Sequence, residues 1–317
     1  MNTAAIIHTG GIGDLLQTFP CLNALRQKWP LAAVTLVGHG ERARLARVAG
    51  LVDDTVDVET CGLHRLFSAQ AGPADVPARL READLILTFL NQESFAAGLS
   101  RLTAARVVAA CSFPEPGACD RSAAQFVYDR LAAQLSLPPR EAVPQLTLPA
   151  DLPEAQSVAR RFPDTAPTVV IHPGSGSPKK NWPLARFIEL AERLSATGLD
   201  TTWVLGPAEM ACDALARTAE SRHAMVCAPL VEVAALLARA RCYVGNDSGI
   251  THLAAALGTP TVALFGPSEH TVWSPRGAHV RTLVAPGRLM AAIQVRAVLA
   301  LCNELSTTQR TGTRRQP

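Results

Sequence analysis

The chain lacks several features that would place it in a common class of protein. No segment holds the roughly 18 consecutive apolar residues of a membrane span, so no membrane-spanning helix is expected. Charged residues make up only 18% of the 317 residues, and the net charge of +3 is too small to indicate nucleic acid as a partner. The hydrophobic fraction of 48% is large enough for substantial cores, and the length suggests two domains.

Paired cysteines and a leader segment are also missing. The eight cysteines form no C-x-x-C pair, and several lie in apolar runs, which is typical of reduced, buried thiols. The first residues lack the basic region of a signal peptide. We therefore expect a cytoplasmic protein, and its mild positive charge is compatible with loose peripheral contact at the cytoplasmic face of the inner membrane.

Three familiar catalytic motifs do not occur in the sequence. The absence of D-x-D, H-E-x-x-H and G-x-S-x-G disfavours a D-x-D metal-dependent transferase, a zincin and an α/β-hydrolase, respectively. No bound metal and no cofactor are expected from the residues that remain.

Apolar runs and amphipathic segments alternate along both halves of the chain. Strands are expected over residues 4–8, 33–37, 55–58, 84–89, 106–110, 168–172, 201–205, 224–228, 242–244 and 261–265. Helices are expected over residues 14–25, 41–48, 94–101, 121–135, 183–195, 208–219, 231–239, 253–257 and 291–301. This order predicts an α/β protein with two doubly wound, Rossmann-like parallel-sheet domains that face a central ligand cleft.

A run of prolines between Pro138 and Pro153 indicates the crossover between the two domains. We therefore predict an N-terminal domain over residues 1–150 and a C-terminal domain over residues 151–303. Residues 304–317 are polar and are expected to form a disordered tail. The final helix is a candidate to pack back on the N-terminal domain.

The most informative segment is Gly245-Asn246-Asp247-Ser248-Gly249-Ile250-Thr251-His252, between an apolar run and a helix of small residues. A loop at the carboxyl end of a strand that leads into a helix presents free backbone N–H groups to an anion. Ligands of open α/β sheets bind at that edge. The segment therefore predicts a site for a phosphorylated ligand.

Three further loops follow expected strands. His8-Thr9-Gly10-Gly11-Ile12-Gly13-Asp14 is not a dinucleotide fingerprint, because Leu16 stands where G-x-G-x-x-G needs glycine. Its simple interpretation is a tight turn with Asp14 as a helix cap, and its functional one is a base that faces the cleft. The segment from His172 to Pro183 is either a phosphate cradle or a flexible surface loop with solvated lysines. Glu209, in Gly206-Pro207-Ala208-Glu209, either binds a ribose or is an acid in the first turn of a helix that interacts favourably with the positive end of the helix dipole.

Together these loops resemble those of glycosyltransferase family 9, the ADP-heptose:lipopolysaccharide heptosyltransferases and their relatives. The resemblance runs from Ile6 to about Leu301, and its carriers are GGIGDLLQTFP, HPGSGSPKKNWP, GPAE and GNDSGITHLAAALGTPTVALFGPSE. It implies a GT-B fold, with the acceptor mainly on the first domain and the nucleotide sugar mainly on the second. It also implies inverting, metal-independent transfer of a heptose, with ADP-heptose as the donor, in lipopolysaccharide biosynthesis.

By position, the resemblance also implies roles for single residues. Asp14 matches the general base, and Gly11 and Gly13 belong to the acceptor-side loop. Lys180, the lysine just before Asn-Trp, matches the catalytic lysine that contacts the donor phosphate.

The remaining matches lie in the donor site. Ser175 and Gly176 match positions near the diphosphate, where some lipopolysaccharide enzymes carry two threonines. Glu209 matches the acid that binds the ribose. The donor-binding loop is matched by Asp247, Ser248, Gly249 and His252.

Alternatives remain open at this point. A sugar-nucleotide epimerase or hydrolase of the same fold would consume donor without an acceptor, and an inactive nucleotide-sugar-binding protein would bind ADP without turnover. An NAD-dependent dehydrogenase is opposed by the broken glycine fingerprint. The acceptor is a saccharide, a lipid-linked sugar, a protein side chain or a small molecule, and the sequence does not choose among them.

Overall fold

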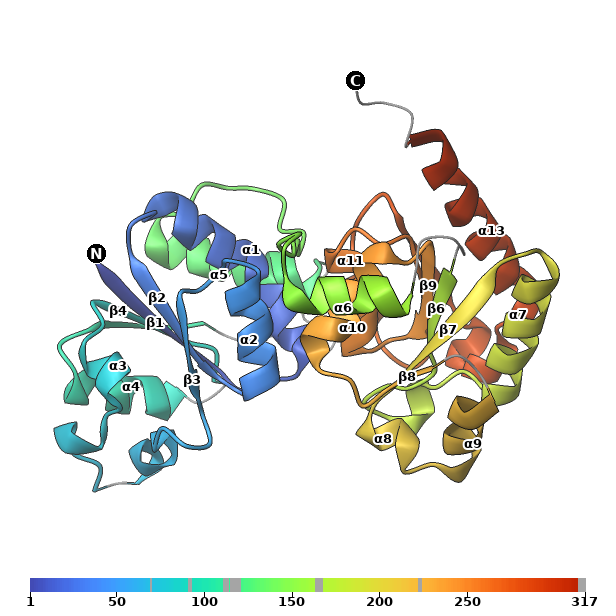
Figure 1. The fold of residues 1–317 in the computed structure, drawn as a ribbon. Coiled ribbons are helices and arrows are strands. Elements are labelled where there is room, and N and C mark those ends of the chain that lie inside the picture. Colours follow the sequence, from blue (N-terminus) through green and yellow to red (C-terminus); the bar gives the residue numbers. More distant parts are fainter. Residues whose placement is uncertain are drawn as a thin grey trace. The chain divides into compact units, whose positions relative to one another are not determined.

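The computed structural model describes residues 1–68, 70–90, 93–110, 114, 121–162, 168–221 and 224–312. The chain divides into two compact units, Met1–Pro144 and Gln145–Pro317. The division falls six residues before the boundary that the proline run indicated at 150/151. Each unit is an α/β unit with a wholly parallel sheet (Figure 1).

The N-terminal sheet has the strand order β3-β2-β1-β4-β5. Its strands are β1 Thr3–His8, β2 Ala33–Gly38, β3 Asp54–Asp57, β4 Leu85–Thr88 and β5 Arg106–Ala109. Successive side chains of a strand point to opposite faces, and both faces of β1 are buried. Ala5 and Ile7 pack with Leu80, Phe95 and Leu99 in one core cluster.

Helices cover both faces of this sheet. The α-helices are α1 Ile12–Lys28, α2 Gly40–Val48, α3 Ala78–Arg81, α4 Glu93–Leu102 and α5 Ala123–Leu135, with 3-10 turns η1 Leu63–Phe67 and η2 Pro73–Asp75. Figure 1 shows α1 and α5 on one side of the sheet and α3 and α4 on the other. This sandwich explains why the strands read as continuous apolar runs rather than alternating ones.

The C-terminal sheet has the order β11-β10-β9-β6-β7-β8. Its strands are β6 Thr168–His172, β7 Asp200–Leu205, β8 Ala224–Val226, β9 Cys242–Asn246, β10 Thr261–Phe265 and β11 Val280–Val284. The edge strand β11 was not expected from the sequence. Its side chains are all partly exposed, so it carries less of the apolar signal that marks a buried strand.

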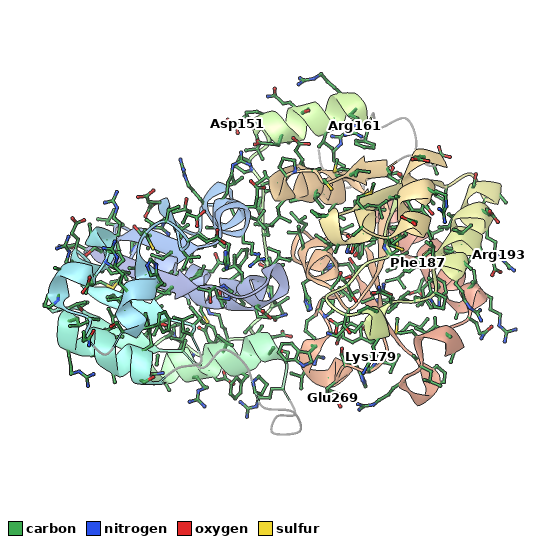
Figure 2. The ribbon with its side chains drawn as sticks, turned by 90° about the horizontal axis from the view of Figure 1, so that it is seen from below. Asp151, Arg161, Lys179, Phe187, Arg193 and Glu269 are labelled. Carbon is green, nitrogen blue, oxygen red and sulfur yellow. The ribbon has the colours of Figure 1, made fainter. Side chains whose placement is uncertain are left out.

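The helices of this unit also lie on both faces of its sheet. They are α6 Pro153–Arg161, α7 Leu184–Ala196, α8 Pro207–Met210, α9 Asp213–Ser221, α10 Leu230–Arg239, α11 Gly249–Ala256, α12 His270–Trp273 and α13 Val295–Gly312, with 3-10 turns η3 Pro178–Lys180, η4 Pro286–Arg288 and η5 Met290–Ala292. In Figure 1, α7 and α13 lie on one side of the strands and α10 and α11 on the other. Figure 2 shows Phe187 of α7 directed into the unit and Arg193 directed outward.

The observed helices differ from the expected ones in three places. The helix expected over 208–219 is two helices, α8 and α9, with a break at 211–212. The segment after the proline run contains α6, since Pro153 stands at the first turn of a helix, where proline is tolerated. Figure 2 marks this helix by Asp151 and Arg161.

The third concerns the tail, because α13 continues to Gly312 through residues predicted to be disordered. Leu305 belongs to the core cluster, and the carbonyl oxygen of Ser306 accepts a hydrogen bond of 2.8 Å from Arg241. Residues 313–317 lie outside the described residues. Within its own unit α13 packs on α7, β9 and β10, and its packing on the N-terminal domain stays a prediction.

In each sheet the chain first adds strands toward one edge and then returns to the middle to add strands toward the other edge. The point at which this strand order reverses positions the sites. In the N-terminal unit β1 and β4 are neighbours on either side of the reversal, and in the C-terminal unit β6 and β9 are. The carboxyl ends of such strand pairs form the crevice in which open α/β sheets bind ligands. No helix in the described part of the chain is long and apolar enough to cross a membrane.

Candidate functional site

The loops that follow β6 and β9 are tied together by one buried amide. Asn246, the last residue of β9, is fully buried. Its Oδ1 accepts a hydrogen bond of 2.9 Å from the backbone N–H of Trp182, and its Nδ2 donates one of 2.7 Å to the carbonyl oxygen of Pro173. The side chain thereby contacts both ends of the loop between β6 and α7. A fully paired buried amide fixes the geometry of the backbone that it bridges.

An ion pair joins these two strand ends. Lys180 Nζ lies 2.7 Å from Asp247 Oδ2, with the lysine side chain 35% exposed and the aspartate side chain 9% exposed. Ser268, from the loop after β10, donates a hydrogen bond of 2.5 Å to the same oxygen. The three residues lie in the segments that follow β6, β9 and β10, and these strands are adjacent in the sheet. Figure 2 shows their neighbours Lys179 and Glu269 at one edge of the unit.

The helix that follows Asp247 begins with an ordered cap. Ser248 Oγ accepts a hydrogen bond of 3.3 Å from the backbone N–H of Thr251. The first N–H groups of a helix have no partner within it. In the described part of the chain no acceptor is assigned to the N–H groups of Gly249 and Ile250, which are partly exposed. This end of α11 can therefore receive an anion beside Lys180. His252, also in the first turn, is buried.

Tight packing behind the cap leaves room only for glycine at position 245. A Cβ on Gly245 would lie 2.1 Å from the hydroxyl oxygen of Tyr243. That hydroxyl lies 3.0 Å from Thr251 Oγ1, whose own proton is donated to the carbonyl oxygen of Asn246. The strand end and the first turn of α11 are therefore held as one rigid piece.

The remaining residues of the β6 loop differ in their contacts. Ser175 Oγ lies 2.8 Å from the carbonyl oxygen of Ser177 and 2.6 Å from Asn181 Oδ1, so its hydroxyl is engaged within the loop. Gly176 is exposed, and a Cβ there would meet nothing within 4 Å. The structure thus places Gly176 where its backbone is accessible, while Ser175 shapes the loop.

Glu209 is buried against the same loop. Its Oε2 accepts a hydrogen bond of 2.8 Å from the N–H of Gly206, which is the helix-capping interaction. A Cβ on Gly174 would lie 1.9 Å from its Oε1, so the carboxylate touches the loop backbone. Behind it, burial lowers the pKa of His172, while the carbonyl oxygen of Val204, 2.9 Å from Nδ1, and the charge of Glu209 oppose that shift.

In the N-terminal unit the equivalent position is the β1 loop. Gly11 precedes α1, and its N–H donates a hydrogen bond of 2.9 Å to Asp14 Oδ2. Asp14 is thus at the third helical position rather than at the cap itself, and it is partly exposed. Gly13 lies in the same first turn and is also partly exposed. The capping contact uses one carboxylate oxygen, so a second role at the other oxygen is compatible with it.

A buried histidine supports this loop. Burial, and next the positive charge of Arg42, lower the pKa of His8 to about 4. Arg42 Nη1 donates a hydrogen bond of 2.8 Å to the carbonyl oxygen of Gly10. A Cβ on Gly10 would lie 3.0 Å from both Asp14 and His8. The site therefore holds a neutral imidazole on one side of Gly10 and a carboxylate on the other.

Two residues of the C-terminal site were missed by sequence reasoning. Ser268 stands in a Gly-Pro-Ser loop directly after an apolar strand, so the strand-end rule used for the other loops could have found it. Asn246 has no such signal, because its role depends on contacts with Pro173 and Trp182, which are distant in sequence. The described residues include no cluster of three or more histidines, cysteines or acids that could hold a metal ion.

Comparison with known proteins agrees with this architecture. The model of the family "Glycosyltransferase family 9 (heptosyltransferase)" matches residues 123–296, more than half of the chain. Lipopolysaccharide heptosyltransferase 3 of Escherichia coli is 33% identical over 113 residues, which cover 34% of this chain and 33% of that protein. The matched stretch therefore spans about a third of the length of this curated relative.

Solved structures share the fold over nearly the whole chain. A family 9 glycosyl transferase from Veillonella parvula DSM 2008 superposes with a TM-score of 0.79 at 20% identity, covering 97% of this chain and 98% of the other. The E. coli heptosyltransferase WaaC with ADP gives 0.73 at 22% identity, with coverage of 96% and 99%. The fold is thus that of GT-B heptosyltransferases, and the chain belongs to glycosyltransferase family 9.

Proposed function

We propose that this protein is an inverting, metal-independent glycosyltransferase that moves a heptose from ADP-heptose to an acceptor hydroxyl. One observation carries the proposal. Lys180 lies beside the open N-terminus of α11 at the reversal point of the C-terminal sheet, where it contacts Asp247. A lysine ammonium and free helix N–H groups at a strand end are the two features that a diphosphate needs.

The donor's nucleotide is assigned to the C-terminal unit on this basis. Glu209 is the acid proposed to accept a ribose hydroxyl, and its Oε1 lies against Gly174 in the β6 loop, two residues before the exposed Gly176. Ser248, Gly249 and His252 form the first turn that faces the diphosphate. ADP is chosen as the nucleotide because E. coli WaaC, a structural neighbour, was solved with ADP.

The reaction is a single displacement at the anomeric carbon of the donor sugar. The acceptor oxygen forms the new bond to that carbon while the bond to the diphosphate oxygen breaks, which inverts the configuration. Asp14 takes the proton of the acceptor hydroxyl as general base. The departing ADP carries away the electron pair, and Lys180 and the N–H groups of Gly249 and Ile250 stabilise its negative charge without a metal ion.

The acceptor is proposed to be a saccharide of the lipopolysaccharide core, in keeping with the names of the curated relatives. We place the reaction in the cytoplasm, with transient contact at the membrane face where such a lipid-linked sugar would be presented. The sequence pI of about 8.5 supports attraction to an anionic surface.

A donor assay in excess EDTA tests the proposal. Release of ADP from ADP-heptose should depend on an added acceptor and continue in the presence of the chelator. UDP- and GDP-sugars should neither raise the melting temperature nor be consumed, since only a nucleotide that binds the native state stabilises it. ADP release without any acceptor would indicate a hydrolase or epimerase, and strict dependence on a metal would contradict the mechanism.

A further inference from the structure

The ion pair between Lys180 and Asp247 poses a problem for the proposed donor site. Asp247 is almost wholly buried, and its Oδ2 holds the same ammonium group that a diphosphate would bind. Removing one partner of a buried pair leaves an uncompensated charge, which is strongly unfavourable. A ligand that draws Lys180 away from the carboxylate therefore needs a replacement partner for Asp247.

Ser268 supplies a second hydrogen bond to that oxygen. Its hydroxyl, on the loop that follows β10, donates this hydrogen bond to Asp247 Oδ2. Asp247 is held on its backbone side as well, because its N–H donates to the carbonyl oxygen of Leu264 at 3.0 Å. The carboxylate can thus stay in place, with a donor still on Oδ2, when the ammonium group leaves.

The loop that carries Ser268 is itself fixed. Arg288 contacts it on both sides of the serine, with Nη1 3.4 Å from the carbonyl oxygen of Pro267 and Nη2 2.9 Å from Glu269 Oε2. The hydrogen bond from Arg288 lowers the pKa of Glu269, which keeps this acid ionised and the contact in place. A Cβ on Gly266 would lie 2.5 Å from the sulfur of Met290, so the backbone here is packed closely.

We infer that Ser268 is a positioning residue that retains Asp247 while Lys180 is exchanged from this carboxylate to the diphosphate of the ligand. The inference rests on the proposed nucleotide-sugar site and extends it. In the free protein, the carboxylate of Asp247 pairs with the ammonium group of Lys180 in the place that the diphosphate would take. When the diphosphate binds, the serine hydroxyl becomes the principal donor to Asp247, so its contribution is larger in the bound state than in the free state.

Calorimetric titration with ADP tests this exchange. Ser268→Ala should raise the Kd for ADP about 10-fold, the effect of one hydrogen bond to a charged group. Ser268→Thr keeps a hydroxyl and should restore binding to within about 2-fold. In an Asp247→Asn background, which removes the buried charge, Ser268→Ala should change the Kd by less than about 2-fold. Ser195→Ala, an exposed serine of α7 in the same unit, is the matched control and should leave the Kd unchanged.

Each alternative outcome has a definite meaning. If ADP binds the wild type and Ser268→Ala lowers the melting temperature without changing the Kd, the serine is merely structural and the inference is wrong. If the loss of affinity is the same in the Asp247→Asn background, Ser268 does not act through Asp247, which also overturns it. If ADP does not bind the wild-type protein at all, the proposed nucleotide site fails, and the inference fails with it.

Discussion

The first strand of each unit ends in a buried histidine, but the residues that follow this histidine have different contacts in the two units. β1 ends in His8 and β6 ends in His172, and burial lowers the pKa of both imidazoles. After each histidine the chain passes a glycine that lies against a carboxylate, Asp14 in the first unit and Glu209 in the second. Each of these acids also accepts a hydrogen bond from a helix-capping N–H.

The difference lies in the cation. Among the described residues no lysine or arginine pairs with Asp14, whereas Lys180 pairs with Asp247 at the end of the neighbouring strand. A carboxylate without a cation partner can accept a proton from a substrate, and a lysine beside a helix N-terminus can hold an anion. The same strand-end geometry can therefore serve as a base in one unit and as an anion site in the other. The predictions below either break this division of roles or sharpen it.

The largest effect is expected for the base. Asp14→Asn should lower kcat by about 10²- to 10⁴-fold, the usual contribution of a general base, because the amide cannot take the acceptor proton. Turnover of ADP-heptose with a saccharide acceptor is the measurement. Asp75→Asn is the matched control, because Asp75 Oδ2 accepts the same capping hydrogen bond from Gly72 at 2.9 Å. Equal activity in the two variants would mean that Asp14 is only a cap.

The next effect is expected at the anion site. Lys180→Ala should weaken ADP binding about 10- to 100-fold, since the hydrogen bond between the ammonium group and the diphosphate is lost and Asp247 keeps its charge without a cation partner. Lys179→Ala removes the same charge one residue away, at an exposed position, and should change the affinity by less than about 2-fold. Equal losses in both variants, measured by calorimetry, would reduce the site to general electrostatic attraction.

The buried histidines that end β1 and β6, His8 and His172, predict that stability depends on pH. The pKa of His8 is lowered from 6.5 to about 4 in the folded protein, so between these values the unfolded state binds more protons. The free energy of unfolding should therefore fall as the pH drops through this window, by about 2 kcal/mol for His8 between pH 7 and pH 5. Urea unfolding of His8→Gln should lose this part of the slope and keep the part due to His172. An unchanged slope would show that His8 is not buried as a neutral imidazole.

The smallest effect is expected for the glycine that lies against Glu209. Gly174→Ala would bring a Cβ to 1.9 Å from Glu209 Oε1, and the carboxylate must move to admit it. Because the clash is with the end of a side chain, we expect a loss of about 1 kcal/mol in the free energy of unfolding, at the low end for overpacking. Gly176→Ala in the same loop meets nothing and should stay within about 0.5 kcal/mol. Equal melting temperatures for the two variants would mean that Glu209 does not touch the loop.

Much of the fold could be predicted from the sequence, because buried parallel strands are continuous apolar runs between glycine-rich loops. Ten of the eleven strands of the described chain lie where the sequence predicted a strand. The exception, β11, is a partly exposed edge strand with a weak apolar signal. Local signals also failed where tertiary contacts decide, as for α13, whose last turns are held by Leu305 in the core and by Arg241.

The candidate site divides in the same way. Its loops were predicted from their places after strands, and the family was predicted from four motifs together. The pairing of Lys180 with Asp247 and the contact from Ser268 could not be predicted, because residues 67 and 21 positions apart meet only through the strand order of the sheet. The general base and the donor residues stay predictions, since the roles of these side chains depend on substrates.

The division of roles between the units is tested most directly by calorimetric titration of ADP into Asp14→Asn and Lys180→Ala side by side. The account predicts that Asp14→Asn binds ADP with the wild-type affinity although it has lost turnover, whereas Lys180→Ala binds ADP at least about 10-fold more weakly. Wild-type affinity in Lys180→Ala, or an equal loss in both variants, would contradict it.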